Sequence, residues 1–387
     1  MSATSFSFSR IVLYTGFAAT GVAMALPGSV LPALLVQWTL ADSQAGLLFF
    51  LGWLGSSLGA LLVRGSLVRS LVLGTSLLAT ASFGMAFGSR TSCFVWMAIF
   101  GAGLGATMTA ISLLQAARHA QHRGIELNRL NLFWALGACT CPSLAAHSLR
   151  IANIRGIFSA VGFFFAALLL WVLVMERDQP VASQPSRLAA TSAGPTSWLS
   201  GLTRWPLLII LLMFLPTGIE SAVGGWIAAY VQRTQETIAT TVTAGSCFWV
   251  GMLCSRTLNS TFLLLRRSER FVLGQSMITI VFGMALLLVS KTSLGILPAV
   301  FLTGFGLGPV YPLLLAQALQ YSENTVIFFI AGLGSSFLPW LTGVVSTSAS
   351  SLRTGLFVPF AGSLLMLALG LRLLAKPSLP PPHAASK

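Results

Sequence analysis

The chain has 387 residues, of which 55% are hydrophobic and only 8% are charged. Soluble proteins carry about 25% charged residues, so this composition excludes an ordinary soluble domain and indicates a membrane protein. The net charge of +14 does not indicate nucleic-acid binding, because the basic residues are scattered between apolar segments and form no continuous basic face interleaved with aromatics.

Twelve apolar segments are each long enough to cross a bilayer as a helix, which takes about 20 residues. The first is too long for the apolar core of a signal peptide, so we expect it to remain as a membrane span. We therefore predict an all-α integral membrane protein with twelve transmembrane helices. In chain order the segments cover residues 11–35, 43–63, 70–88, 92–117, 127–149, 156–175, 206–230, 239–258, 270–290, 293–318, 324–346 and 353–375.

The longest polar stretch, RDQPVASQPSRLAATSAGPTSW, lies between the sixth and seventh segments and is rich in Pro, Ser and Ala. Such a composition is typical of a linker. We predict an N-terminal six-helix bundle at 1–176, a cytoplasmic linker at 177–204 and a C-terminal six-helix bundle at 205–376. The Pro-rich tail at 377–387 is expected to be disordered.

The basic residues predict the orientation. With the N-terminus in the cytoplasm, sixteen of the 22 basic residues fall on the cytoplasmic side of the spans. Cytoplasmic loops of membrane proteins are enriched in Lys and Arg, so both termini are predicted to be cytoplasmic. By analogy, the short loops and compact length suggest a monomer in a bacterial inner membrane.

The two halves resemble each other at a nearly constant offset. Residues 72–74 and 272–274 both read Val-Leu-Gly, and glycines alternate in the fourth and tenth segments. Two halves that enter the membrane from the same side form a parallel repeat, which is typical of transporters that bind their solute between the halves.

Glycines and prolines inside the segments have two interpretations. They are either ordinary packing positions of membrane helices or points where a helix bends during transport. The candidate bending residues are Gly101, Gly103, Gly105, Pro142, Gly224, Gly225, Gly304, Gly306, Gly308 and Pro339.

Glu220 is the one acid among eight that falls well inside a predicted span, in the stretch PTGIESAVGGWIAAYVQR. A carboxylate inside a bilayer is costly and usually faces a cavity. It is predicted to accept hydrogen bonds from a solute, to carry a coupling proton, or to do both. The alternative is a structural acid bonded to a neighbouring helix.

Other polar and aromatic residues could line the same cavity. A sugar needs amides and carboxylates for its hydroxyl edges and an indole for its apolar face. Pro216 and the pair Gly224-Gly225 weaken the helix around Glu220, so Trp226 is expected to turn inward. For isolated aromatics the alternative is packing or interfacial anchoring. The remaining candidates are Gln115, Asn128, Asn131, Trp134, Trp249, Tyr311 and Gln317.

Several kinds of site are disfavoured. The five cysteines form no CxxC motif, and His119 and His122 lie between Arg118 and Arg123, so no metal site is predicted. There is no nucleotide-binding loop and no convincing nucleophile–base pair. We therefore expect no cofactor and no enzyme activity.

The twelve spans, two halves and central linker resemble the major facilitator superfamily. Gly59, Arg64 and Arg69 are similar to that superfamily's loop motif after the second span, but Val63 stands where an Asp is expected. This departure puts the usual acid-mediated gating contact in doubt.

A narrower resemblance is to the fucose permease-like group of sugar–proton symporters. The stretches GIESAVGGWIAAY and LNRLNLFWALGACTCP carry it, and the first is the more specific. Members often have an acid in the first or fourth span, and this chain has none there. The resemblance implies a monosaccharide as solute and proton coupling through Glu220.

We thus predict a secondary transporter of a small neutral solute that works by alternating access. Facilitated diffusion without proton coupling is a variant of this prediction. Three alternatives remain: an exporter of drugs or metabolites, in which a cationic solute would pair with Glu220; a receptor or scaffold on a transporter fold; and, less favoured, a membrane enzyme.

Overall fold

The computed structural model describes residues 3–119, 123–178, 207–234, 237–259, 266–321 and 326–375, and the regular structure in these ranges is helical. Residues 177 and 178 end α6, whereas the rest of the predicted linker and the predicted tail lie outside the described residues. The helices are α1 (Ala3–Gln37), α2 (Asp42–Leu61), α3 (Leu67–Phe87), α4 (Ser92–Arg118), α5 (Arg123–Ile151), α6 (Ile154–Asp178), α9 (Leu207–Arg233), α10 (Ile238–Leu258), α12 (Glu269–Val289), α13 (Ser293–Tyr321), α14 (Val326–Ser348), α15 (Leu352–Gly355) and α16 (Phe357–Ala375).

Eleven spans among the described residues are long and apolar enough to cross a membrane, with α15 and α16 counted as one. The helix α10 is missing from these eleven although it has 21 residues. Its first half, IATTVTAGS, is rich in hydroxyl side chains, which lowers its hydropathy. With α10 included, a helix occupies each of the twelve predicted segments, and the prediction of an all-α membrane protein is confirmed.

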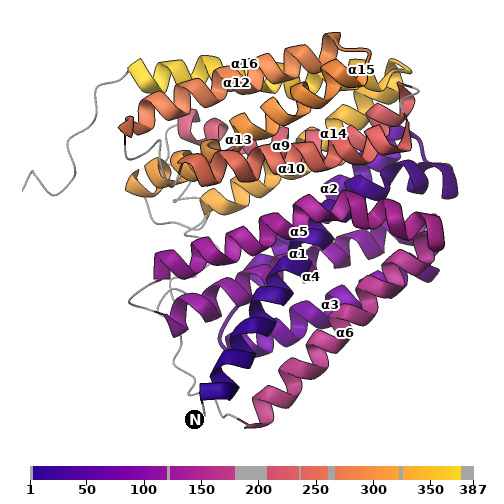
Figure 1. The fold of residues 1–387 in the computed structure, drawn as a ribbon, viewed down its shortest axis with the longest axis vertical. Helices are drawn as coiled ribbons and strands as arrows, with labels where there is room; N and C mark the ends of the chain where they lie inside the picture. The colour runs from indigo at the N-terminus through magenta and orange to yellow at the C-terminus, as the bar shows by residue number, and fades with distance from the viewer. Residues whose placement is uncertain are drawn as a thin grey trace, which may run out of the picture.

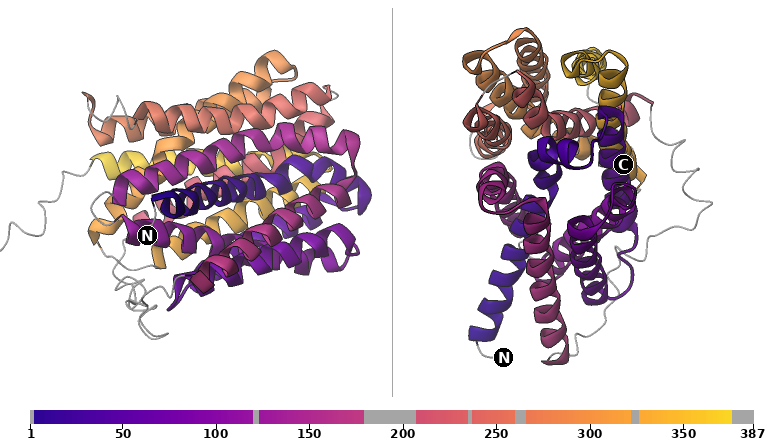
Figure 2. Two further views of the ribbon diagram at one scale, coloured as in Figure 1. Left: turned by 60° about the horizontal axis from the view of Figure 1, so that its bottom comes forward. Right: turned by 90° about the vertical axis from the view of Figure 1, so that its right-hand side faces the viewer.

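The helices form two bundles, α1–α6 and α9–α16, which lie side by side in Figures 1 and 2. Inside the first bundle α1 packs on α5, α2 on α4, and α3 on both α4 and α6. The second bundle repeats this pattern, because α9 packs on α14, α10 on α13, and α12 on both α13 and α16. The internal repeat read from the sequence is therefore also a repeat of packing.

Alternating glycines allow α4 and α13 to touch two neighbours at once. A side chain at Gly101 or Gly105 would overlap the backbone of α2, whereas one at Gly103 would overlap α3. In the second bundle the corresponding roles fall to three other glycines. Gly304 and Gly308 face α10, and Gly306 faces α12. These positions serve close helix packing in this conformation, and a role in bending remains a prediction.

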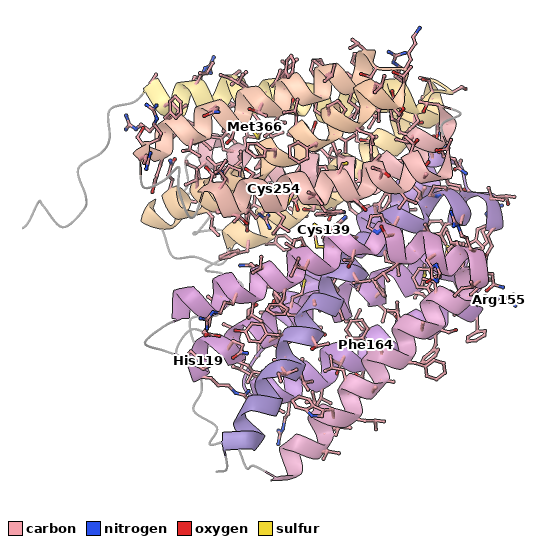
Figure 3. The ribbon with its side chains drawn as sticks, viewed as in Figure 1. His119, Cys139, Arg155, Phe164, Cys254 and Met366 are labelled. Carbon is pink, nitrogen blue, oxygen red and sulfur yellow. The ribbon has the colours of Figure 1, made fainter. Side chains whose placement is uncertain are left out.

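The bundles meet along three helix pairs: α2 with α14, α5 with α10, and α1 with α9. Cys139 on α5 and Cys254 on α10 mark the second junction in Figure 3. We call the side on which α1 begins and α16 ends the terminal face, and the opposite side, where α2 begins and α9 ends, the distal face. On the way to the distal face Gly28 of α1 approaches the backbone of Gly224 and Gly225 on α9. Among the described residues α4 and α13 make at most marginal contact.

Candidate functional site

Glu220 lines a small cavity between the two bundles. The cavity has a volume of about 40 Å³ and is walled by α1, α2, α4, α9 and α10, with Trp53, Phe100 and Trp249 among its lining residues. This volume holds a few water molecules and is too small for a sugar ring. The Glu220 side chain forms no hydrogen bond or ion pair with another described residue, so its carboxylate is presented to the cavity.

Arg256 of α10 is the charged neighbour of this acid. It interacts electrostatically with both Glu220 and Tyr311. Its Nε donates a hydrogen bond to the carbonyl of Gly308, at 3.3 Å. Its guanidinium carbon lies 5.9 Å from the ring centre of Trp134, within the range of a cation–π contact. Arg256 thus links the acid in one bundle to an indole in the other.

Sequence reasoning missed Arg256. The charge count places Arg256 on the cytoplasmic side, because this residue lies two positions before the end of its predicted span. The available signal was that its position falls inside 239–258, and a guanidinium inside a span generally has a partner or a cavity.

Two tryptophans from opposite bundles meet next to Arg256. The rings of Trp134 on α5 and Trp249 on α10 are arranged edge to face, with centroids 5.9 Å apart. Trp134 is buried, and its indole nitrogen has no partner among the described residues. The predicted candidates Trp134 and Trp249 are therefore brought together at the α5–α10 junction.

Gln115 is a second buried polar group without a partner. It is 1% exposed, and both atoms of its carboxamide lack a hydrogen bond within the described residues. Buried polar atoms are usually hydrogen-bonded, so an orphaned carboxamide indicates a group that can bind water or a solute. Gln115 lies on α4 toward the terminal face and does not line the Glu220 cavity.

Trp226 does not turn into the cavity in this conformation. It is fully buried, and its Nε1 donates a hydrogen bond to the Pro339 carbonyl, at 2.9 Å. Its ring also packs on Phe49 of α2, with centroids 5.7 Å apart. The expectation of an inward-facing indole is therefore corrected: hydrogen bonding holds the ring against α14, and Trp226 ties three helices together.

The other described residues that are predicted to contact the solute do not line the Glu220 cavity. Asn131 is exposed on α5, and Gln317 is half-buried on α13; neither lines the Glu220 cavity. Tyr311, partly buried on α13, is within electrostatic range of Glu220. The side chain of Asn128 lies outside the described part of the structure.

The residues of the loop motif between α2 and α3 take part in packing and hydrogen bonding within the first bundle. Gly59 packs against the backbone of Ala102, and Arg64 donates from Nε to the carbonyl of Leu61, at 3.1 Å. The amide of Arg69 donates to Ser66 Oγ, which caps α3. Val63, at the position where the motif has Asp, is buried.

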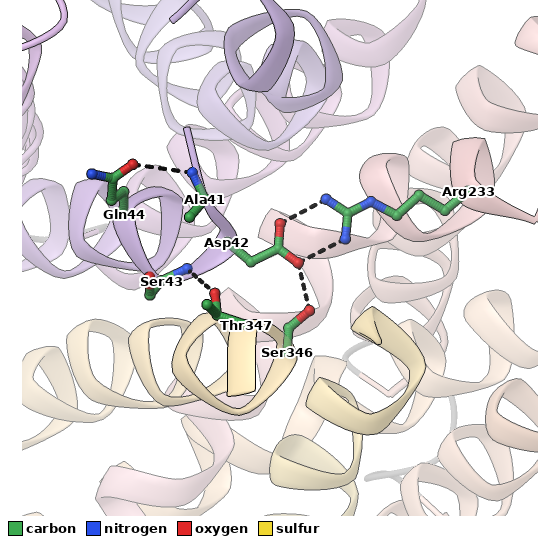
Figure 4. Close-up of polar contacts among 7 residues, drawn as sticks. All are labelled: Ala41, Asp42, Ser43, Gln44, Arg233, Ser346 and Thr347. Carbon is green, nitrogen blue, oxygen red and sulfur yellow. Dashed lines mark hydrogen bonds and ion pairs between the residues drawn. The ribbon is translucent and has the colours of Figure 1, made fainter. Parts of the chain in front are cut away.

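An ion pair joins the bundles at the distal face (Figure 4). The two carboxylate oxygens of Asp42 on α2 accept hydrogen bonds from Arg233 on α9, at 2.6 and 2.7 Å. Ser346 of α14 donates to the same carboxylate, at 2.5 Å. Next to them the amide of Ser43 donates to Thr347 Oγ1, at 2.8 Å. The sequence places Asp42 at a helix end, and nothing in it indicates this partner.

Two six-helix bundles with the same internal packing and a cavity between them are the arrangement of transport proteins that are built on a parallel repeat. Comparison with known families agrees with this class. The profile of the Major Facilitator Superfamily matches residues 13–328, so the chain belongs to this superfamily of transporters.

Solved transporters share the fold. A bacterial homologue of the human lysosomal transporter Spinster, in an inward-facing and occupied conformation, superposes with a TM-score of 0.72 at 10% identity, over 97% of this chain and 98% of that one. A D-xylose–proton symporter gives a TM-score of 0.70 at 12% identity, over 95% and 98% of the two chains. The nucleoside transporter NupG gives 0.69 at 13% identity, over 94% and 100%. A search of curated protein sequences found no match.

Proposed function

We propose that this chain moves a small neutral solute, in the first place a monosaccharide, by alternating access of its two bundles, and that Glu220 carries a coupling proton. The observation behind the proposal is the carboxylate of Glu220, which faces a cavity between the bundles and forms no direct pair with a described residue. Alternating access needs such a site where the two halves meet.

The charges near the cavity favour a neutral solute over a cation. Arg256 is an electrostatic neighbour of Glu220, so a positively charged drug bound at this acid would also meet the charge of the guanidinium. The indoles of Trp53 and Trp249 line the same cavity and offer apolar faces to a sugar ring.

The proximity of Arg256 to Glu220 supports the proposal of proton coupling. When Glu220 is protonated, Arg256 loses its nearby negative charge, and the contacts of the guanidinium with Trp134 and Gly308 are the ones that remain. Because these contacts involve both bundles, a proton on Glu220 would change the balance of forces between them. A transporter of this kind is driven by the proton gradient.

The fucose permease-like resemblance supports a sugar, and two of the similar structures are described as a D-xylose–proton symporter and a nucleoside transporter. Both of those solutes are uncharged rings bearing hydroxyl groups. We also propose, as the charge bias and loop lengths indicate, a monomer in a bacterial inner membrane with both termini in the cytoplasm.

The test is uptake of radiolabelled D-xylose, D-glucose, L-fucose and uridine into proteoliposomes, with and without an inward proton gradient. We expect the gradient to accelerate uptake of at least one solute by wild type. Glu220→Gln should abolish this acceleration, because an amide cannot release a proton. Glu269→Gln is the matched control, since Glu269 is an exposed acid in the first turn of α12.

Equal uptake with and without the gradient would reject proton coupling and leave facilitated diffusion. Uptake of none of these solutes by folded protein would reject the neutral solute and favour export of a cation that pairs with Glu220. Binding of a solute without any flux would indicate a receptor on a transporter fold.

A further inference from the structure

A second and much larger cavity lies on the distal side of the Glu220 cavity. Its volume is about 540 Å³, within the range of sites that hold small molecules and more than ten times the volume of the cavity at Glu220. In this conformation the space that fits a solute is therefore not the space that contains the acid. We call the larger cavity the distal vestibule.

Four helices enclose the vestibule. Its lining residues come from α1, α5, α9 and α10, together with Asn153 and the first residue of α6, Ile154. These helices contact each other in a closed ring, because α1 packs on α5, α5 on α10, α10 on α9, and α9 on α1. Gln37, Arg150 and Gln232 lie at or near the distal ends of α1, α5 and α9, so one end of the cavity lies at the distal face.

The vestibule and the Glu220 cavity share a wall. Gly28, Gly224 and Trp249 line both cavities. Gly28 meets the carbonyl of Gly224, which leaves no room for a side chain there, and the indole of Trp249 lies beside Gly224. Backbone contact between α1 and α9 closes one part of the wall, and the indole of Trp249 forms another part.

The mouth of the vestibule carries free polar groups. Gln37 on α1, Gln232 on α9 and Arg150 on α5 are exposed, and within the described ranges their side chains form no hydrogen bond or ion pair. No acid occurs among the described residues that line the vestibule. Two carboxamides and a guanidinium above an indole floor suit a neutral ring with hydroxyl or carbonyl groups on its edge.

We propose that the distal vestibule is a second binding site for the transported neutral solute, in series with the Glu220 cavity, and that Trp249 is the partition between the two. This inference rests on the proposed function. It adds a site on α1, α5, α9 and α10 at which a solute is held before or after it reaches Glu220.

The first test measures protection of a cysteine placed in the vestibule. Thr241 of α10 lines the vestibule, whereas Thr292, between α12 and α13, is exposed on the distal face and does not. Thr241→Cys and Thr292→Cys would each be labelled from the distal face with a membrane-impermeant maleimide. Peptide mapping by mass spectrometry separates the introduced thiol from the five native cysteines.

We expect both thiols to react. D-xylose, D-glucose, L-fucose or uridine at ten times its Kd should slow labelling of Thr241→Cys by about tenfold, because a bound solute shields the thiol in proportion to 1 + [L]/Kd. Labelling of Thr292→Cys should not change. Gln232→Ala, an exposed position, should weaken the protection without changing the rate measured in the absence of solute.

The outcomes separate this inference from the proposed function. If a solute that wild type transports does not protect Thr241→Cys, the second site is rejected and transport stands. If a solute protects the thiol but is not transported, the vestibule site stands and the proposed function fails. A Thr241→Cys thiol that does not react from the distal face rejects the vestibule itself.

A second test addresses the partition. Ser221 lines the Glu220 cavity and is almost fully buried. Ser221→Cys should resist a small impermeant methanethiosulfonate added at the distal face, and Trp249→Ala in the same chain should make it reactive. Trp249→Phe should preserve most of the resistance. Unchanged reactivity after Trp249→Ala would show that the indole is not the partition.

Discussion

Asp42 and Arg233 lie 191 residues apart in the chain and form an ion pair with two hydrogen bonds that joins the two bundles at the distal face. Asp42 begins α2 in the first bundle, and Arg233 ends α9 in the second. Any motion that separates the bundles at this face must break the pair. The pair is therefore a contact whose loss should favour a distal-open conformation.

Asp42→Asn is expected to shift the chain toward that conformation. The Arg233 side chain is 42% exposed and its partner 10%, so the loss should lie between those of a surface pair and a buried pair, about 1–2 kcal/mol. Spin labels at Ala152→Cys and Thr292→Cys, exposed on the distal side of the two bundles, would report the separation by pulsed electron resonance.

Arg90→Gln provides the control for this measurement. Arg90 bonds Gln44 within the first bundle, so its loss removes a distal charge without touching the interface between the bundles. A distance distribution that is the same for wild type and Asp42→Asn would show that the ion pair does not hold the two bundles together at the distal face.

Arg256→Gln should lower solute uptake about tenfold or more, because it leaves the Glu220 carboxylate without its neighbouring cation, and uncompensated charges inside a protein cost several kcal/mol. Arg256→Lys should retain part of the activity, since the ammonium keeps the charge but loses the flat contact with Trp134. Initial rates of uptake would check both variants. Arg372→Gln is the control and should transport like wild type, because Arg372 lies in the exposed last turn of α16. Equal losses of uptake in Arg256→Gln, Arg256→Lys and Arg372→Gln would contradict a specific role for Arg256.

Trp226→Phe should destabilise the protein by about 0.5–1.5 kcal/mol, because the hydrogen bond to the Pro339 carbonyl is lost while most of the ring packing remains. Trp226→Ala should cost about 3–5 kcal/mol, because it also leaves a cavity between α9, α2 and α14. Thermal unfolding in detergent would rank the variants. Trp340→Phe is the control, because the Trp340 indole nitrogen forms no hydrogen bond with the described residues. If Trp340→Phe lowers the stability as much as Trp226→Phe does, loss of the hydrogen bond is not the cause.

Gly105→Ala should destabilise the first bundle by about 1–3 kcal/mol, the usual cost of overpacking, because the added methyl group would overlap the carbonyl of Ser56 on α2. Gly362→Ala on α16 should be neutral or stabilising, since its neighbours lie at 3.4 Å or more and alanine favours a helix. The midpoints of thermal unfolding would show the contrast. Similar midpoints for the two variants would mean that the α2–α4 contact is looser than the structure shows.

The sequence by itself determined the helices of this protein and their order. A run of about 20 apolar residues satisfies its own backbone hydrogen bonds inside a bilayer, so length and hydropathy suffice to place each span. The sequence also indicated that the chain is a repeat, because glycines recur at matching positions in its two halves. Glu220 stood out because a carboxylate is rare and costly in such a segment.

Only the tertiary structure decided which faces of these helices meet. A helix that is apolar all round carries no stripe that says how it is rotated against its neighbours, so the pattern could not show that Trp226 faces α14 rather than the cavity. Three contacts join residues from opposite bundles: the Asp42–Arg233 pair, the approach of Arg256 to Trp134, and the edge-to-face contact of Trp134 with Trp249. Such contacts depend on how the bundles dock, and hydropathy along a single helix does not record that arrangement.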